Sequence, residues 1–180
     1  MAQTATIYVL SIDLNEMDRG VYERLELRVA RHPSETAEFM LVRVLAYCLE
    51  YEEGIAFGND LSSGDEPAVL IRDMTGRLTG WFEVGMPDAS RMHRGSKAAG
   101  RVGLYTHRDI RQVLGQFEGA KIHRAGEIRV RAFERQAVET IAALIDRRTG
   151  MSVSVTDGDV YVTVGDQGFA LPMTEHRLAP

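Results

Sequence analysis

Two glutamates lie within or beside apolar stretches that predict buried strands, where a charged side chain needs a compensating partner. Glu83 lies in "WFEVGMPD", where the flanking apolar residues predict a buried strand, and Glu66 stands two residues before the apolar run "AVLIR". A glutamate inside a buried strand costs desolvation free energy unless a partner or an ion satisfies it. Two carboxylates on neighbouring strands could meet that need together, because Mg²⁺ and related hard cations prefer oxygen ligands.

A strand pairing that joins the two acids follows from the turn expected at Thr75-Gly76. Centring the turn there places residue 68 opposite 83, 70 opposite 81 and 72 opposite 79. Glu66 then points to the same face as Glu83. Diagonal neighbours on antiparallel strands have Cα atoms roughly 7–8 Å apart, so both side chains could bind one cation.

Other interpretations of these acids remain open. Arg72 would share the Glu83 face and could neutralise that glutamate as a buried ion pair without any metal. Glu66 could be a solvated loop carboxylate, and its neighbour Asp65 competes with it as a metal ligand. Glu35 is expected at the start of a long helix, where the helix dipole alone favours a carboxylate. Lys97, in "RGSKAAG", is interpreted on composition as a surface lysine.

The periodicity predicts an α/β protein with a mixed sheet flanked by helices. Strands are expected at 4–14 and 21–30, joined as an N-terminal hairpin, and "MSVSVTDGDVYVTVGDQGFALPM" is expected to form two C-terminal hairpins. Helices are expected from Pro33-Ser34 to Gly54, within 87–100 and 108–119, and from Glu134 to Gly150. No linker or repeat interrupts the 180 residues, so a single domain over 1–180 is predicted.

Composition and charge restrict the setting and the partners. Residues 1–18 show no basic n-region, long apolar run or cleavage site, so we expect no signal peptide, no membrane contact and a cytoplasmic location. The single cysteine, Cys48, suits a reducing compartment and a role in the core. The net charge is −5, yet residues 91–131 carry ten Lys/Arg against three acids. Such a basic segment predicts contact with phosphates of DNA or RNA, although a salt-bridged surface is equally compatible.

Five stretches taken in order resemble a known family. They are "ARHPSETAEFMLVRVLAYCLEY", "DLSSGDEPAV", "WFEVGMPD", "HRGSKAAGRVGLYTH" and "VTVGDQGF", and together they look like the successive motifs of the YaeQ family. That family is similar in fold to the PD-(D/E)XK, or restriction-endonuclease-like, phosphodiesterases. The resemblance therefore implies a restriction-endonuclease-like core with an extra N-terminal hairpin and extra C-terminal β-hairpins.

The resemblance also implies a set of site residues. Glu66 and Glu83 correspond to the two acids that hold Mg²⁺ or Mn²⁺, Glu35 to the helix glutamate, and Lys97 to a lysine supplied by the following helix. The usual lysine position, two residues after the second acid, is Gly85 in this chain. Arg91, Arg94 and Arg101 are expected to contact nucleic-acid phosphates.

Two functions follow as hypotheses. The first is a Mg²⁺-dependent phosphodiesterase acting on nucleic acid, in which the cation activates a water molecule and neutralises charge on the phosphodiester. The alternative is a catalytically inactive module for binding nucleic acid or protein, which keeps the fold while the acids serve stability. The replacement of the usual lysine by Gly85 favours the alternative.

Overall fold

The computed structural model describes residues 4–59 and 65–179, and these residues group into two compact units. The first unit contains the described residues up to 41 together with 134–173, and the second contains 42–133 with the residues from 174 onward. The division falls within helix α1 (Ala37–Leu49). The single domain over 1–180 remains a prediction.

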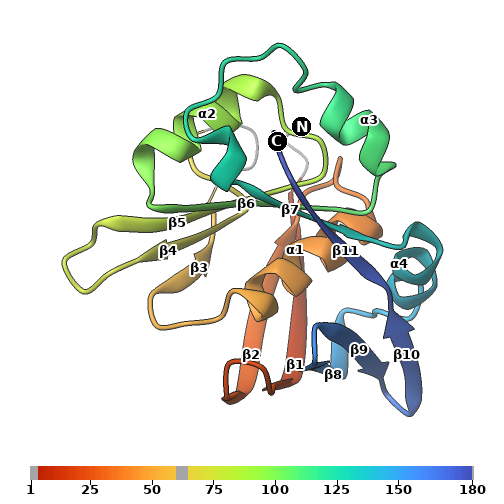
Figure 1. The fold of residues 1–180 in the computed structure, drawn as a ribbon. Coiled ribbons are helices and arrows are strands. Elements are labelled where there is room, and N and C mark those ends of the chain that lie inside the picture. Colours follow the sequence, from red (N-terminus) through yellow and green to blue (C-terminus); the bar gives the residue numbers. More distant parts are fainter. Residues whose placement is uncertain (1–3, 60–64, 180) are drawn as a thin grey trace. The chain divides into compact units, whose positions relative to one another are not determined.

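The first unit holds a five-stranded mixed sheet (Figure 1). In pairing order its strands are β10 (Gln167–Leu171), β9 (Asp159–Val164), β8 (Arg148–Thr156), β1 (Thr6–Glu16) and β2 (Val21–Arg31). β1 runs parallel to β8, and the remaining neighbours are antiparallel. The predicted N-terminal and C-terminal hairpins are therefore not separate additions, because they join into one sheet. Helix α4 (Arg135–Ala142) packs against β10.

The sequence predicted one turn of this unit correctly and one helix end wrongly. Asp157 and Gly158 both have positive φ, 53° and 80°, as a tight primed turn between β8 and β9 requires. The helix expected to reach Gly150 instead ends at Ala142, and Gly150 lies inside β8. Residues 148–155 pair in parallel with β1, and this long-range pairing overrides the local helical spacing.

The second unit holds a six-stranded mixed sheet that presents the candidate site. In pairing order its strands are β11 (Met173–Arg177), β7 (Arg129–Phe133), β6 (Arg101–Thr106), β5 (Leu78–Val84), β4 (Val69–Arg72) and β3 (Ile55–Phe57). β3, β4 and β5 are antiparallel, whereas β5, β6 and β7 are parallel. The short edge strands β3 and β11 were not predicted. An α/β fold with mixed sheets flanked by helices is confirmed.

Helices supply the two parallel crossovers of this sheet. α2 (Ala89–Ala98) connects β5 to β6, and α3 (Ile110–Gly115) with the 3₁₀ turn η1 (Ala125–Glu127) lies between β6 and β7. Both helices lie on the same side of the strands they connect (Figure 1). The buried cluster beneath them consists of Met92, Leu104, Val113, Phe117, Ile128, Val130 and Leu178.

Helix α1 is more deeply buried than its expected single apolar face. Residues 40–46 are all buried, so the helix is enclosed around its whole circumference at that level. Cys48 is fully buried, and burial raises the pKa of its thiol to about 12. The thiol is therefore neutral near pH 7, which confirms the expected role in the core. Among the described residues, no helix combines the length and apolar character needed to cross a bilayer.

The hairpin of β4 and β5 differs from the predicted one near its turn. Leu70 lies opposite Trp81 as expected, but the register shifts after Ile71, and Arg72 lies opposite Leu78 rather than Thr79. The chain reverses through a three-residue loop at 74–76 in which Gly76 has φ 83°, and Asp73 and Arg77 close the loop by a main-chain hydrogen bond. The extra loop residue accounts for the shift.

Gly95 allows α2 to approach β5 closely. An added Cβ at Gly95 would lie 2.5 Å from Cδ1 of the buried Trp81. We expect Gly95→Ala to lower the free energy of unfolding by about 1–3 kcal/mol, because the rigid indole cannot yield, despite the better helix propensity of alanine. Gly115→Ala is the control, since a Cβ at that helical glycine meets nothing within 4 Å. Urea unfolding of both variants measures the difference, and equal stability of the two would contradict this packing.

Candidate functional site

The charge of Glu83 is satisfied by an arginine. Glu83 lies in β5 with 3% of its surface exposed. Arg91 of α2 donates through Nε to Oε1 at 3.1 Å and through Nη2 to Oε2 at 3.2 Å, which is a bidentate pair. Trp81, two residues earlier on the same face of β5, donates its indole N–H to Oε1 at 3.0 Å. Both carboxylate oxygens of Glu83 are therefore occupied.

The first turn of α2 holds Arg91 in place. Asp88 caps the helix, accepting from the backbone N–H of Arg91 at 2.9 Å and from the Ser90 hydroxyl at 2.6 Å. The Ser90 hydrogen bond is the main reason that the pKa of Asp88 is lowered. Residues 91 and 95 lie one helical turn apart, so the face that presents Arg91 to Glu83 also presents Gly95 to Trp81.

Burial and the charge of Arg91 shift the pKa of Glu83 in opposite directions. Desolvation raises the pKa of the Glu83 carboxyl, and the charge of Arg91 lowers it, but desolvation is the larger effect. The net pKa is raised even though the carboxylate has a bidentate partner. The ion pair is therefore closely balanced against the cost of removing it from water.

The two acids of the predicted metal pair contact different arginines. The carboxylate of Glu66 accepts from the backbone N–H of Asn59 at 2.8 Å and lies 3.6 Å from the guanidinium of Arg72. The alternative of a buried ion pair at Glu83 is confirmed, but its partner is Arg91 and not Arg72, which pairs with Glu66. Only the main-chain carbonyl of Glu66 joins the Glu83 cluster, where it accepts from Nη2 of Arg91 at 3.1 Å.

Asp65 and Lys97 lie at the surface. Asp65 is exposed and forms a long pair of 3.9 Å with Arg94. Lys97 is exposed in the last turn of α2, and its side chain has no ion pair or hydrogen bond within the described residues. Six residues separate it from Arg91, which is a rotation of about 240° around the helix axis. That rotation explains why α2 presents the arginine, and not the lysine, to Glu83.

Glu35 and Gly85 complete the positions implied by the resemblance. Glu35 belongs to the first unit and lies two residues before α1, rather than on the helix. Its carboxylate accepts from the backbone N–H of His32 at 3.3 Å. Gly85 has φ 88°, so a lysine at that position would require a left-handed backbone that side chains disfavour. The backbone thus gives a physical reason for the missing lysine.

The arrangement does not fit a divalent cation. In residues 4–59 and 65–179, no three His, Cys, Asp or Glu side chains come together as metal ligands. Glu83 is occupied by Arg91 and Trp81, and Glu66 by Asn59 and Arg72. The donor set for Mg²⁺ or Mn²⁺ would therefore form only if both arginines moved away.

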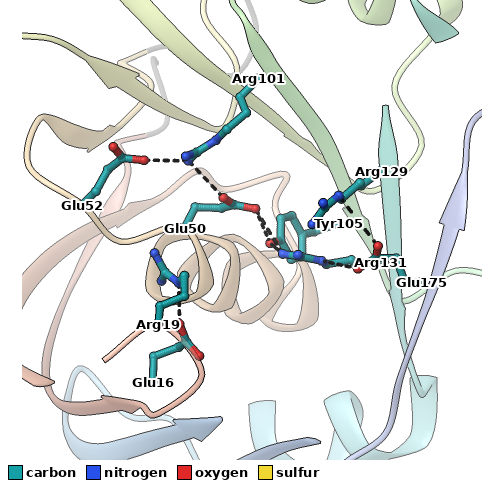
Figure 2. A network of polar contacts seen from close by, with 9 residues as sticks. All are labelled: Glu16, Arg19, Glu50, Glu52, Arg101, Tyr105, Arg129, Arg131 and Glu175. Atoms are coloured by element: carbon teal, nitrogen blue, oxygen red, sulfur yellow. Dashed lines mark hydrogen bonds and ion pairs between the residues drawn. The ribbon is translucent and has the colours of Figure 1, made fainter. Parts of the chain in front are cut away.

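A second polar cluster in this unit was not predicted from the sequence (Figure 2). Glu50, directly after α1, receives the guanidinium groups of Arg101 and Arg131, each at 3.2 Å. Glu52 contacts the same Nη2 of Arg101 at 2.7 Å, and Glu175 of β11 contacts Nε of Arg131 at 3.2 Å. The cluster connects the end of α1 to three strands of the sheet. Figure 2 also draws the pair Arg19–Glu16, which belongs to the first unit.

Tyr105 lies at the centre of this cluster. Its hydroxyl donates to Glu50 at 2.6 Å and also contacts Arg131. Burial is the main reason that the pKa of Tyr105 is raised well above its ordinary value, and the charge of Glu50 adds to the effect. A neutral phenol beside a carboxylate and a guanidinium can donate one hydrogen bond and accept another, which makes this tyrosine a connector.

These contacts neutralise much of the basic segment 91–131. Arg91, Arg101 and Arg131 are held by glutamates, and Arg129 lies 3.8 Å from Glu175. Arg124 uses its guanidinium to bind the carbonyls of Ser96 and Ala99 at the end of α2. The sequence could count these charges but could not show that most of them contact nearby acids or carbonyls.

Comparison with known proteins identifies the family. The family profile described as "YaeQ protein" matches residues 1–173. The chain is 29% identical over 164 residues to the "Uncharacterized protein YaeQ" of Escherichia coli (strain K12), covering 91% of both chains. It is 27% identical over 175 residues to the protein of the same name from Salmonella typhi, covering 97% of both.

Solved structures agree with this result. The crystal structure of the YaeQ protein from Pseudomonas syringae matches with a TM-score of 0.86 and 34% identity, covering 97% of each chain. The YaeQ protein from Xanthomonas axonopodis pv. citri matches with a TM-score of 0.86 and 32% identity, covering 96% of this chain and 98% of that one. The chain belongs to the YaeQ family.

Removal of Arg91 should be costly, because it leaves a buried carboxylate without its partner. We expect Arg91→Ala to lower the free energy of unfolding at pH 7 by about 3 kcal/mol. Adding Glu83→Gln to that variant should recover part of the loss, since the buried charge is then gone. Arg94→Ala, an exposed arginine one turn along α2, should change stability by about 0.5 kcal/mol or less. Urea unfolding gives all four values, and equal losses at 91 and 94 would refute the buried pair.

The raised pKa of Glu83 predicts a pH dependence of stability. The protonated carboxyl favours the folded state below about pH 4.3, where an unfolded glutamate titrates, and this contribution is lost as the pH rises through the raised pKa. Glu83→Gln stays neutral, so its unfolding free energy relative to the parent protein should increase across that window. Urea unfolding at a series of pH values measures it, with Glu118→Gln at an exposed position as control. A relative stability that falls with rising pH would show that the arginine outweighs desolvation.

Proposed function

We propose that the chain is a noncatalytic nucleic-acid-binding module on a restriction-endonuclease-like core. The order of elements in the second unit supports such a core. α1 is followed by three antiparallel strands, then by α2 and a strand parallel to the third. Glu66 lies three residues before β4 and Glu83 lies on the neighbouring β5, which supports the correspondence that the resemblance implies for the two acids. The reduced, buried Cys48 is compatible with the proposed cytoplasmic location.

The observation that carries the noncatalytic proposal is the bidentate pair of Arg91 with Glu83. A guanidinium already supplies positive charge where a nuclease would need a divalent ion, and the indole of Trp81 donates a third hydrogen bond, to Oε1. The pair also attaches α2 to β5. In this proposal the acid keeps a structural role, and α2 is a fixed support for binding groups.

The binding groups lie on the outward face of α2. Arg94 and Lys97 are three residues apart and thus neighbours on the helix surface, and both are exposed. Arg94 lies 3.9 Å from the exposed Asp65, and a surface pair of this length contributes little. Exposed lysines and arginines of this kind make the phosphate contacts that dominate nucleic-acid affinity. Arg101 is the third proposed contact, although a phosphate would compete there with Glu50 and Glu52.

One observation favours the enzyme as a second candidate. Nη2 of Arg91 contacts both the carboxylate of Glu83 and the carbonyl of Glu66, so the two acidic residues converge on one cationic group. A Mg²⁺- or Mn²⁺-dependent phosphodiesterase would use Glu66 and Glu83 as ligands, with Glu35 and Lys97 assisting. The side-chain contacts described above favour the binding module over this candidate.

Fluorescence anisotropy with labelled single-stranded DNA and RNA oligonucleotides tests the proposal. The parent protein should bind at low salt, and Arg94→Glu/Lys97→Glu should weaken binding at least about tenfold and reduce its salt dependence. Arg148→Glu, an exposed arginine on β8 of the first unit, should leave the affinity nearly unchanged. If Arg94→Glu/Lys97→Glu and Arg148→Glu lost affinity equally, or if the parent protein did not bind, the α2 surface would be rejected as the binding site.

Cleavage assays separate the two candidates. The parent protein with Mg²⁺ or Mn²⁺ should leave the same oligonucleotides intact, because the acids are held by Arg91 and Arg72. Cleavage that disappears in Glu83→Gln and Lys97→Ala, while circular dichroism shows both variants folded, would establish the phosphodiesterase instead.

A further inference from the structure

Strand β2 exposes a long main-chain edge in the first unit. It is an outer strand of the five-stranded sheet and pairs on one side with β1. Val9 of β1 donates its backbone N–H to the carbonyl of Arg147, directly before β8, and Met17, directly after β1, donates to the carbonyl of Val155 in β8. Successive residues of a strand direct their main-chain groups to alternate sides, so odd residues of β1 face β8 and even residues face β2.

The register of β1 and β2 then identifies the edge positions. Each even residue of β1 lies opposite an odd residue of β2, for example Leu10 opposite Leu27 and Ile12 opposite Leu25. The even residues of β2 therefore direct their main-chain N–H and C=O groups away from β1. In the part of the chain that the structure describes, no hydrogen bond satisfies these groups at four such positions, Tyr22, Arg24, Glu26 and Arg28.

The side chains at those positions alternate in charge. Leu25, Leu27 and Val29 are buried on one face of β2, whereas the even residues are exposed on the other. Tyr22 is 61% exposed. Internal contacts are weak: Arg24 lies 3.5 Å from the exposed Asp13, and Ser11 donates to Glu26 at 2.8 Å. A partner strand would thus meet an aromatic residue followed by charges of sign plus, minus and plus.

We propose that β2 pairs antiparallel with β2 of a second copy of this chain, about a two-fold axis at Leu25. In this register the edge groups of Arg24 lie opposite those of the partner's Glu26, and the edge groups of Tyr22 lie opposite those of the partner's Arg28. Symmetry repeats both pairs, so the ladder contains about eight main-chain hydrogen bonds. The two five-stranded sheets become one continuous sheet.

Charge selects this register over its neighbours. A slip of one residue would place edge-directed groups opposite groups that face β1, and is excluded. A shift in one direction places Glu26 opposite the partner's Glu26, and a shift in the other places Arg24 opposite the partner's Arg24, so like charges repel. A longer shift of the axis toward the C-terminal end of β2 would require the edge of Ala30, which already has an interaction, and a longer shift toward the N-terminal end leaves only two edge pairs within the strand. One register therefore combines a full ladder with opposite charges.

The same charges explain why the occupant is a second copy and not an arbitrary strand. Charged residues on an edge strand oppose pairing with most other strands. The sequence from Tyr22 to Arg28 is complementary to itself when reversed, which is what a two-fold interface requires. The pairing uses only residues of the first unit, so it is independent of the proposed nucleic-acid surface on α2.

Sedimentation velocity over about 1–200 µM protein tests the dimer, a range suited to a small interface. The parent chain should dimerise, and Arg24→Glu or Glu26→Arg alone should raise the dimer Kd about tenfold, because each change opposes like charges at two symmetric pairs. The double variant Arg24→Glu/Glu26→Arg restores opposite charges and should return the Kd to within about threefold of the parent. A parent chain that stays monomeric, or a double variant as weak as the singles, overturns the proposal.

Cysteine crosslinking tests the register directly. Cα atoms of a hydrogen-bonded antiparallel pair are roughly 5.5 Å apart, within the range of a disulfide. Arg24→Cys/Glu26→Cys should give an oxidised dimer on non-reducing gels, while either single cysteine variant should not, because like positions lie on the diagonal. The buried Cys48 is present in every variant, so any crosslink through it would appear equally in all samples. Equal crosslinking by a single variant would refute the axis at Leu25.

Discussion

The ion pair of Glu83 with Arg91 is the constraint on which the second unit depends. A carboxylate in a central strand is tolerated only because a guanidinium reaches it in bidentate geometry and an indole donates beside it. The reach of Arg91 depends on how closely α2 approaches β5, and Gly95 permits that approach by leaving room for Trp81. The packing of α2 on β5 and the ion pair of Glu83 with Arg91 therefore depend on each other, and a change in one disturbs the other.

The same constraint determines what the site can do. The carboxylates of Glu66 and Glu83 are held by separate arginines and are not left available to a cation. Two further features act in the same direction: the backbone at Gly85 disfavours a lysine, and Lys97 points to solvent. These contacts support the proposal of a binding module that contacts its ligand through the outer face of α2. In this proposal, Glu83 of β5 serves only to attach α2 to the sheet.

Fold prediction succeeded where a local pattern and a long-range contact agree. The N-terminal hairpin, the Asp157-Gly158 turn and helix α2 follow from alternation, turn chemistry and capping, which short segments encode. It failed where pairing with a distant strand decided the outcome. Residues 148–150 carry a helical pattern but extend along β1, and β3 and β11 are too short to stand out without their neighbours.

The sequence by itself determined that Glu83 lies in a buried strand and must have a partner, because its apolar neighbours predict the strand and desolvation demands compensation. It also determined the family, whose motifs extend over nearly the whole chain. Only the tertiary structure decided which cation compensates the charge. Arg72 was the nearer candidate by strand register, but the bulge after Ile71 and the position of α2 brought Arg91 to Glu83 instead. Ion pairing depends on distances of a few ångströms, and those are fixed by packing between elements that sequence spacing does not measure.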